Sequence, residues 1–523
     1  MVPALSLCVF VLAGCATDAA TGARPDQEGP EIRVTAPAEG GQVHDPDVVL
    51  QGTLADSTGL SSMWVEVNGR AGDTTRFAAA PRQVAFGVTL IGLRVGNNSV
   101  RVLARDVRGN VGTRSFGLAY APRDVTPPRL VVLAPGTEVT VSVDSVRITG
   151  RATDDVGVRS IRYSVDGGAE MELSITPDTA VSFAFTVSAL PVGGNTIRIV
   201  ARDAAGGTGT VVVSAARRPP PYTLTPLGTF GGGGSAALGV NESGEVVGWA
   251  QNPANSLLPF VWRGGALTRL AADGESGTAG FVNDAGMVAG TTYVTYPATR
   301  VRVWTDGATR VLPIDSVEPV ASGINGRGDV VGHTNASTPD TLPGTAFVWR
   351  NGSVAYLGVD AGAVRSRATG INDRGQVVGT LYFEDRGRSA FLWENGRFTL
   401  LFPRGTRSAA VDVNEHGHVL VERPNSEHII WEPTRTRAVE GMGRPQAMND
   451  HGHVVGEAGG VNVPTRGVLW IRGKAFDLTS LLPDSSWTVL TATGINNRGQ
   501  ITGSARNQTT GKVEAVLLTP ASR

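Results

Sequence analysis

The sequence predicts an all-β protein in which two β-sandwiches precede a seven-bladed β-propeller closed by an N-terminal strand. Three observations lead to this fold class. Glycine accounts for 68 of 523 residues, only 18% of residues are charged, and short apolar runs alternate with turn residues throughout. Two segments of the first half resemble each other at an offset of about 97 residues. One motif repeats seven times in the second half, at intervals of about 35–47 residues, which is typical of repeat architectures.

The repeated motif is Asn-x-x-Gly, usually followed by a tryptophan about 21 residues after the asparagine. Its asparagines are Asn241, Asn283, Asn325, Asn372, Asn414, Asn449 and Asn496. Its glycines are Gly244, Gly286, Gly328, Gly375, Gly417, Gly452 and Gly499. Its tryptophans are Trp262, Trp304, Trp349, Trp393, Trp431 and Trp470, and Leu517 takes this place in the seventh copy.

One repeat accounts for four short strands. In the fourth copy we predict strands at 368–372, 376–381, 388–393 and 397–401. The asparagine side chain can bond its own backbone two residues on, and Gly375 supplies the positive φ of a tight reversal. Asn395-Gly396 is a strong hairpin signal. Four antiparallel strands per repeat make a propeller blade.

Continuous apolar runs predict that the third strand of each blade is buried on both faces. Phe391-Leu392-Trp393 is one such run. We therefore predict that the tryptophans pack between neighbouring blades, and an aromatic ladder for sugar binding is the alternative. Too few residues follow Leu517 for a fourth strand in the last blade. The strand at 222–227 has no blade of its own, so we expect it to complete the last blade and close the ring.

The first half contains two units, at residues 31–121 and 127–216, each with about seven short strands separated by turn residues. This pattern predicts β-sandwiches. Both units resemble the immunoglobulin-like (Ig-like) domains of bacterial cell-surface proteins, without the Cys-Trp-Cys core of antibody domains. The proline-rich stretch at 217–221 then predicts a stiff linker to the repeats.

Acidic turns occur at matching places in the two units. Asp154-Asp155 and Asp203 correspond to Asp56 and Asp106 in the first unit. Such carboxylates could bind Ca²⁺, or they could be Asx-turn residues that accept bonds from local backbone donors. We favour Asx turns because Ser57 stands where the second unit has Asp155. We therefore expect no cofactor, with Ca²⁺ in the Ig-like domains as the alternative.

The N-terminus predicts export and a lipid anchor. Residues 4–13 form a short apolar run suited to a signal peptide, and Leu12-Ala13-Gly14-Cys15 resembles the lipobox of bacterial lipoproteins. That resemblance implies a signal peptide at 1–15 and lipidation of Cys15, and Ala16 favours the outer membrane. An ordinary secretory signal is the alternative. Residues 16–30 predict a flexible tether, and Cys8 is the only other cysteine.

The second half resembles a bacterial repeat family. Gly239-Val240-Asn241-Glu242-Ser243-Gly244-Glu245-Val246-Val247-Gly248, followed by Phe260-Val261-Trp262, is similar to the HAF-type extracellular repeats of bacteria. The resemblance covers residues 222–520 and implies secretion and a β-propeller-like fold, but no established activity. The fifth copy departs from the pattern, since Val421 stands where other copies have the glycine of Val-Val-Gly.

Alternating strand directions place both tight turns of every blade on one face and both long connections on the other. The long connections vary most, so we expect ligand contacts there. The candidate residues offer aromatic platforms and planar donors suited to a glycan or an acidic polymer. They are Trp249, Tyr293, Tyr296, His333, Arg365, Arg367, Tyr382, Phe383, Arg386, Arg404, Arg407, Arg466, Trp487 and Arg506.

No recurring catalytic constellation accompanies these residues. The His-Gly-His pairs at 416–418 and 451–453 could bind zinc, but other copies place serine or arginine there, so we predict no metal. We therefore expect a lipid-anchored surface protein for binding or adhesion. A polysaccharide-active enzyme and a structural envelope component are the alternatives. Its expected partners are the membrane and a glycan or surface protein, it is expected to be a monomer, and a net charge of −1 gives no support for nucleic acid.

Overall fold

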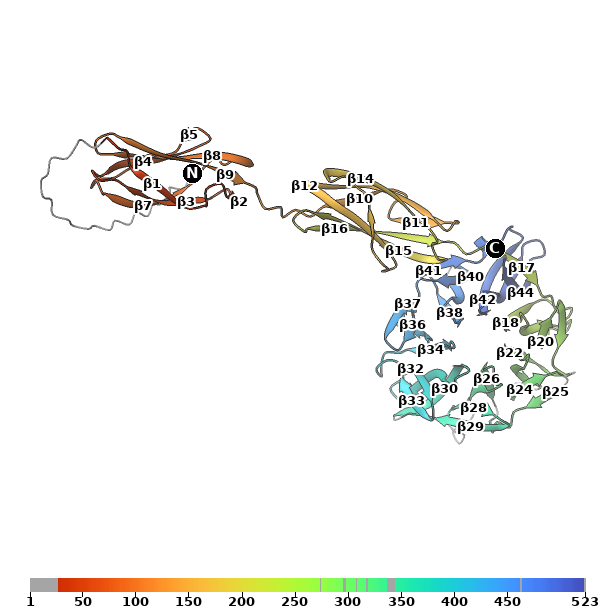
Figure 1. The fold of residues 1–523 in the computed structure, drawn as a ribbon. Helices are drawn as coiled ribbons and strands as arrows, with labels where there is room; N and C mark the ends of the chain where they lie inside the picture. The colour runs from red at the N-terminus through yellow and green to blue at the C-terminus, as the bar shows by residue number, and fades with distance from the viewer. Residues whose placement is uncertain are drawn as a thin grey trace.

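The computed structural model describes residues 27–521, apart from residues 273, 295–297, 307, 317, 336–343, 361 and 461–462. The protein is all-β (Figure 1). Two sandwiches follow one another along the chain, and seven small sheets then lie one after another around a common centre. Within the described residues, the helices are two single 3₁₀ turns, η1 (Pro424–Ser426) and η2 (Thr479–Leu481).

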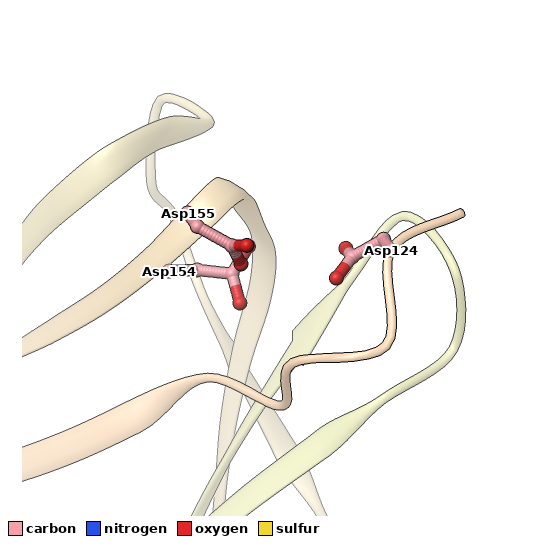
Figure 2. A group of neighbouring side chains, drawn as sticks. All are labelled: Asp124, Asp154 and Asp155. Carbon is pink, nitrogen blue, oxygen red and sulfur yellow. The ribbon is translucent and has the colours of Figure 1, made fainter. Parts of the chain in front are cut away.

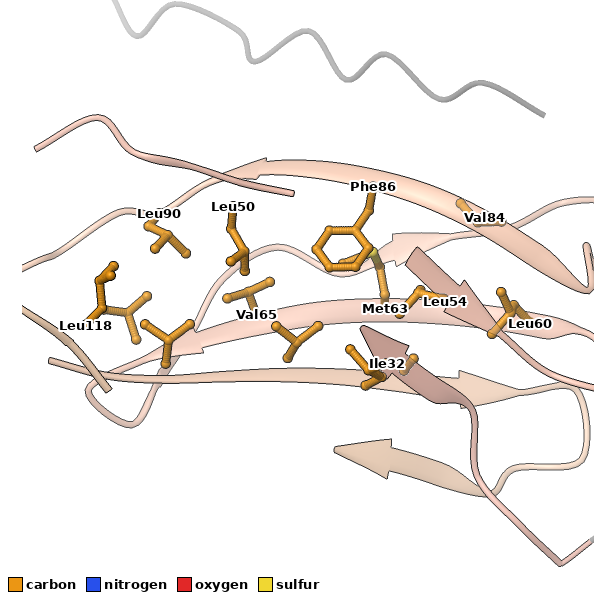
Figure 3. Close-up of a cluster of buried hydrophobic side chains, with 14 residues drawn as sticks. Ile32, Leu50, Leu54, Leu60, Met63, Val65, Val84, Phe86, Leu90 and Leu118 are labelled. Carbon is orange, nitrogen blue, oxygen red and sulfur yellow. The ribbon is translucent and has the colours of Figure 1, made fainter. Parts of the chain in front are cut away.

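The first sandwich has sheets of order β1-β3-β7 and β2-β9-β8-β4-β5, with β6 beside β4. Its strands are β1 (Glu31–Ala36), β2 (Gln42–Val43), β3 (Val49–Ala55), β4 (Leu60–Val67), β5 (Arg70–Ala71), β6 (Thr75–Arg76), β7 (Gln83–Thr89), β8 (Gly96–Asp106) and β9 (Val111–Tyr120). Alternate residues of facing strands point inward. Leu54, Met63 and Phe86 thereby meet in one core between the two layers (Figure 3).

The second sandwich is organised by one long strand. Its strands are β10 (Arg129–Ala134), β11 (Glu138–Val141), β12 (Val146–Val165), β13 (Met171–Leu173), β14 (Asp178–Val187), β15 (Gly193–Asp203) and β16 (Thr208–Arg217). The first part of β12 pairs with β10 and β14, and the second part pairs with β13 and β15. The register shifts between Thr153 and Val158, where β12 passes from one layer to the other. Arg217 ends β16, so the predicted linker begins one residue later than expected.

Seven four-stranded antiparallel sheets follow. Six use consecutive strands. The first sheet has β18 (Ser235–Val240), β19 (Val246–Gln251), β20 (Leu257–Arg263) and β21 (Ala266–Arg269), the second has β22 (Ser276–Val282), β23 (Val288–Tyr293), β24 (Thr299–Thr305) and β25 (Ala308–Val311), and the third has β26 (Pro319–Ile324), β27 (Val330–Thr334), β28 (Ala346–Arg350) and β29 (Ser353–Gly358). The fourth has β30 (Ala363–Ile371), β31 (Val377–Phe383), β32 (Arg388–Glu394) and β33 (Arg397–Leu400), the fifth has β34 (Ala409–Val413), β35 (Val419–Arg423), β36 (Glu427–Glu432) and β37 (Arg435–Ala438), and the sixth has β38 (Arg444–Met448), β39 (Val454–Gly460), β40 (Val463–Ile471) and β41 (Lys474–Asp477). The seventh joins β17 (Tyr222–Pro226) to β42 (Trp487–Ile495), β43 (Ile501–Asn507) and β44 (Val513–Pro520).

The seventh sheet unites the two ends of the repeat region. Strand β17 pairs antiparallel with β44, with Tyr222 opposite Pro520 and Leu224 opposite Leu518. This confirms the strand pairing that the sequence predicts. The register corrects one detail, because Leu518 pairs with Ile501 where Trp393 pairs with Val377. The tryptophan position of the last copy is therefore Leu518, not Leu517.

The seven motif asparagines connect the sheets to one another. Within its own turn, each Oδ1 accepts a hydrogen bond from the backbone N–H four residues on, as Asn372 does from Gln376 at 3.1 Å. Each Nδ2 donates to the backbone carbonyl of the asparagine in the next sheet, at 2.9–3.3 Å. The last of these bonds runs from Asn496 to Asn241. The seven bonds therefore form a closed circle.

The turn glycines and the tryptophans behave largely as the sequence predicts. All seven motif glycines have φ between +70° and +85°, a region that favours glycine. Trp304, Trp349 and Trp470 are buried, and Trp304 packs with Val247 and Val261 of the preceding sheet. The other three tryptophans lie at the edges of the sheet cores and are half-buried: Trp262, Trp393 and Trp431. They still pack against the preceding sheet, as Trp393 does against the cluster of Val331 and Val348, in agreement with the predicted packing between neighbouring sheets.

Candidate functional site

The best-formed group of predicted ligand residues lies where β31 ends and the chain crosses from the fourth sheet to the fifth. The guanidinium carbon of Arg365 lies 5.2 Å from the centre of the Tyr382 ring. That of Arg404 lies 4.4 Å from the centre of the Phe383 ring. We call the group Arg365, Tyr382, Phe383, Arg386, Arg404 and Arg407 the arginine–aromatic patch. Cation–π contacts of this kind hold the guanidinium planes against the rings.

Local backbone structure positions these side chains. The connection from β31 to β32 reverses tightly, with Phe383 N–H donating to the Gly387 carbonyl at 3.0 Å. Arg386 occupies the left-handed region of this turn, at φ 59°, and its side chain is exposed. The next connection folds back beside it, because Arg388 Nε donates to the Arg407 carbonyl at 3.3 Å. Two loops of one sheet thus bring separate arginines to one surface.

The patch carries more guanidinium groups than local carboxylates neutralise. Arg404 is 3.7 Å from Asp385, a distance at which exposed charges attract weakly. Among the described residues, no ion pair involves Arg365, Arg386 or Arg407. These exposed planar cations can each donate two parallel hydrogen bonds to a carboxylate or sulfate. The surface is therefore suited to an anionic ligand.

The structure shows one more arginine–aromatic contact, which the sequence analysis missed, and its arginine is already paired with Glu427 at 3.0 Å. Arg423 lies over the Phe402 ring, with 5.5 Å between its guanidinium carbon and the ring centre. Phe402 belongs to the same connection as Arg404. Arg423 is the last residue of β35, the second strand of the fifth sheet. Phe383 is the last residue of β31, the second strand of the fourth sheet, so the two residues hold equivalent positions. Comparing equivalent connections between repeats would have found Arg423 and Phe402.

Other predicted residues lie elsewhere. Trp249 borders a separate hollow of about 500 Å³ between the first and seventh sheets, lined also by Gly233, Thr510 and Lys512. Trp487 packs against the hydrophobic core of the last two sheets. Tyr293 is half-buried at the end of β23. Three exposed arginines lie on three different strands and make none of the contacts that define the patch: Arg367 on β30, Arg466 on β40 and Arg506 on β43. Cys15 and Tyr296 lie outside the described residues.

The histidines favour structural roles. His333 is 3% exposed, and its Nδ1 lies 3.2 Å from the Ser322 hydroxyl. Burial, with a smaller effect of Arg367, lowers the pKa of His333 to about 3. His416 and His418 have ring centres 5.7 Å apart. Among the described residues, however, the one group of three or more side chains with metal-ligand spacing consists of carboxylates, at the junction of the linker and the second sandwich. The histidine pairs therefore gain no support as a zinc site.

The predicted Asx turns are present in both sandwiches. Asp154 Oδ1 accepts the backbone N–H groups of Val156 and Gly157, at 3.1 and 2.7 Å. Asp56 Oδ1 accepts those of Thr58 and Gly59, at 2.8 and 2.9 Å. One oxygen of each carboxylate therefore stabilises its own turn.

Comparison with known proteins agrees with the sandwich architecture. The family described as "Bacterial Ig domain" matches residues 128–213, which is the second sandwich. The second sandwich is thus an Ig-like domain of the bacterial type. Within the described residues, no helix is long and apolar enough to cross a membrane.

The similar proteins are distant. Bacillopeptidase F of Bacillus subtilis (strain 168) is 24% identical over 188 residues, which cover 34% of this chain and 12% of that protein. The chain therefore matches about an eighth of the length of this curated relative. The fibronectin(III)-like modules of Clostridium thermocellum CbhA align with 36% of this chain and 94% of theirs, at 15% identity and a TM-score of 0.17. A puromycin-hydrolyzing peptidase of Mycobacterium tuberculosis aligns with 57% of this chain and 56% of its own, at 13% identity and a TM-score of 0.37.

Proposed function

We propose that this protein is a bacterial surface lipoprotein that binds an acidic glycan through the arginine–aromatic patch. In this proposal the seven sheets are the blades of a closed β-propeller, and the two Ig-like sandwiches are a stalk between membrane and propeller. The closed circle of asparagine hydrogen bonds and the pairing of β17 with β44 support the propeller. The order of lipobox, tether, sandwiches and repeats along the chain supports the stalk.

The observation that carries the ligand class is the stacking of Arg365 and Arg404 on aromatic rings beside further exposed arginines. Stacked guanidinium groups keep their N–H donors directed outward, so little side-chain entropy is lost when a carboxylate binds. The rings themselves are largely covered, since Phe383 is 5% exposed and Tyr382 is half-buried, so the arginines form the surface that a ligand meets. A glycan with carboxylate or sulfate groups supplies anionic partners to these arginines, whereas a neutral glycan does not.

A binding panel tests this proposal on the intact protein. Immobilised polygalacturonate, hyaluronate and heparin serve as acidic probes, and dextran serves as the neutral one. We expect saturable binding to an acidic probe that weakens with salt. The double variant Arg365→Ala/Arg404→Ala should weaken binding by about 100-fold or more, because each of the two arginines loses at least one charge-assisted hydrogen bond of about 1.5–3 kcal/mol.

Arg397→Ala is the matched control, because Arg397 is exposed on the same sheet but follows the opposite tight turn, at Asn395-Gly396. It should leave binding unchanged. Binding to none of the acidic probes, or equal loss in both variants, would contradict the proposed ligand class.

The proposed lipid anchor has a separate test. Cells that express the protein are labelled with palmitate, and membranes are washed with high salt. We expect label on the wild type and none on a Cys15→Ser variant, with the variant released from membranes. Unlabelled wild-type protein would refute the anchor without affecting the patch.

A further inference from the structure

Three carboxylates meet where the linker from the first sandwich reaches the second. Asp124 lies on the segment between β9 and β10, and Asp154 and Asp155 lie where β12 passes between its two layers. One carboxylate oxygen of each lies within 4.8 Å of the others. Figure 2 shows the side chains of Asp154 and Asp155 directed toward Asp124 across a narrow gap.

The buried oxygens of this cluster have no hydrogen-bond partners. Asp154 is 9% exposed, and its Oδ2 is buried with no partner, although its Oδ1 accepts two turn N–H groups. Asp124 Oδ2 is also buried without a partner. An unpaired buried carboxylate oxygen is costly, since the protein does not replace the water that it loses. Both oxygens are therefore available to a positively charged ligand.

The remaining polar contacts do not neutralise the cluster. Thr126 N–H donates to Asp124 Oδ1 at 3.2 Å, and Thr126 Oγ1 donates to Asp155 Oδ2 at 3.3 Å. Among the described residues, no arginine or lysine forms an ion pair with Asp124, Asp154, Asp155 or the buried Asp203. Partial desolvation, together with the carboxylates of Asp203, Asp154 and Asp155, raises the pKa of Asp124 above its usual value.

The first sandwich shows how the same turns look when protein donors satisfy them. There Asn110 Nδ2 donates to Asp106 Oδ2 at 2.7 Å, and the Thr58 hydroxyl donates to Asp56 Oδ1 at 2.8 Å. In the second sandwich Gly207 takes the place of Asn110, and Val156 takes the place of Thr58. Two side-chain donors are thus lost.

Extra negative charge takes the place of the Thr58 hydroxyl. Asp155 stands where the first unit has Ser57. The two sandwiches therefore share the same acidic turns. In the first, side-chain donors satisfy the carboxylates, and in the second, a cluster of carboxylates is left without such donors.

We propose that Asp124, Asp154 and Asp155 bind one Ca²⁺ ion, which fastens the linker to the end of the second sandwich. Calcium–oxygen distances are about 2.3–2.6 Å, so oxygens on opposite sides of the ion lie about 4.6–5.2 Å apart. The three carboxylate oxygens lie within 4.8 Å of one another, which does not exceed this largest separation, so one ion can contact all three. Water and backbone carbonyls supply the other ligands, since Asp155 is exposed. The ion restricts how the two sandwiches rotate about the linker, independently of any glycan at the repeats.

Limited proteolysis of the full-length protein tests the proposal, because exposed Arg123 precedes Asp124 directly and offers trypsin a cleavage site in the linker. The rate of this cleavage is compared in Ca²⁺ and in EGTA, relative to a second cleavage elsewhere in the same sample. Sites of extracellular modules bind Ca²⁺ with a Kd of about 0.1–1 mM. At about 10 mM Ca²⁺ we therefore expect cleavage after Arg123 to slow by about tenfold or more.

Two variants locate the effect. Asp154→Asn keeps an oxygen for the Val156 and Gly157 N–H groups but loses the charge, so Ca²⁺ should no longer protect the linker. Asp56→Asn makes the same change in the first sandwich and should keep the protection. Calorimetric titration with CaCl₂ should give one site in the wild type and in Asp56→Asn, and none in Asp154→Asn. Equal cleavage in Ca²⁺ and EGTA, or protection that survives Asp154→Asn, would overturn the proposal.

Discussion

The sandwiches and the repeat sheets solve the same packing problem differently. Each sandwich closes its own core between two layers, as Leu54 and Met63 do in the first. A single repeat sheet has no second layer, so its core residues pack against neighbouring sheets. Val303 of the second sheet and Phe347 of the third share one such core. A sandwich should therefore tolerate the loss of its neighbour, whereas a repeat sheet should not.

Buried asparagines show the same contrast on a smaller scale. In the first sandwich, Asn98 Nδ2 donates to the carbonyls of Arg94 and Gly96, at 2.8 and 2.9 Å, and so fixes a loop of its own unit. In the repeats, Asn372 Nδ2 donates to the Asn414 carbonyl of the next sheet at 3.1 Å. The same side chain stabilises a local loop in one region and the assembly of sheets in the other.

Removing strand β17 should have the largest effect. Deletion of Tyr222–Pro226 from the full-length protein takes Tyr222 and Leu224 out of the last core and leaves β44 as an apolar edge. We expect the repeat region to lose about 5 kcal/mol or more, since large buried side chains contribute about 2–5 kcal/mol each, and to aggregate. Calorimetry should show the transition of the first sandwich unchanged.

The reciprocal change is Leu54→Ala, at a fully buried position of the first sandwich. It should cost about 3–5 kcal/mol and should lower the melting transition of that sandwich alone. If the deletion left the repeat transition in place, or Leu54→Ala lowered it, the contrast between self-contained and shared cores would be wrong.

An intermediate effect is expected from the asparagines. Asn372→Ala leaves the Arg374 and Gln376 N–H groups without their acceptor. It also removes one of the two hydrogen bonds of the Asn414 carbonyl, which still accepts from Gly417 N–H, and each unsatisfied buried group costs about 1–3 kcal/mol. We expect a loss of about 2–5 kcal/mol that weakens the whole circle of sheets. Hydrogen exchange should then increase in the fourth and fifth sheets together. The control variant Asn98→Ala should increase hydrogen exchange in the first sandwich only. If exchange in Asn372→Ala increased only in the turn that contains residue 372, the asparagines would not couple the sheets to one another.

The smallest predicted effect depends on pH. The pKa of His333 is about 3 in the folded protein and about 6.5 when unfolded. The unfolded state therefore binds more protons between these values, so stability falls as pH falls from 6.5 toward 3. From pH 7 to 4.5 we expect His333 to lower the stability of the repeat region by about 2 kcal/mol.

Asp412 has the opposite effect on stability. Burial raises its pKa to about 6, so Asp412 stabilises the folded state as pH falls through that value. His333→Gln isolates the histidine. The variant should lose less stability than the wild type between pH 7 and 4.5, measured by denaturant titration of the repeat transition. Identical pH profiles would show that His333 does not titrate on unfolding. The sandwiches should not respond to this variant.

The sequence by itself determined the features that depend on local chain chemistry. Asn-x-x-Gly predicted seven tight turns, and the motif glycines do adopt positive φ, because a reversal of this type admits few other residues. Alternating and continuous apolar runs predicted strands and their burial. The strand at 222–227 was predicted to pair with the C-terminus because it had no sheet of its own.

Sequence spacing could mislead where loop lengths differ between repeats. The connection between β43 and β44 carries an extra residue, so strand pairing places Leu518 opposite Ile501. The fifth sheet pairs Val421 with Ile429 where the fourth pairs Gly379 with Phe391. A larger residue on one strand is offset by a smaller one on the other, and this exchange is visible only once the register is known.

Only the tertiary structure decided which distant groups meet. The asparagine motif explained its own turn, but not the bond from Asn372 to Asn414, because that partner lies in another sheet. Arg404 reaches Phe383 through the packing of two loops, and Asp124 reaches Asp154 because the linker folds against the bend in β12. Local patterns fix turns and strands through steric and hydrogen-bonding limits within a few residues. Contacts between loops depend on how whole sheets pack, so the patch and the carboxylate cluster emerge only in three dimensions.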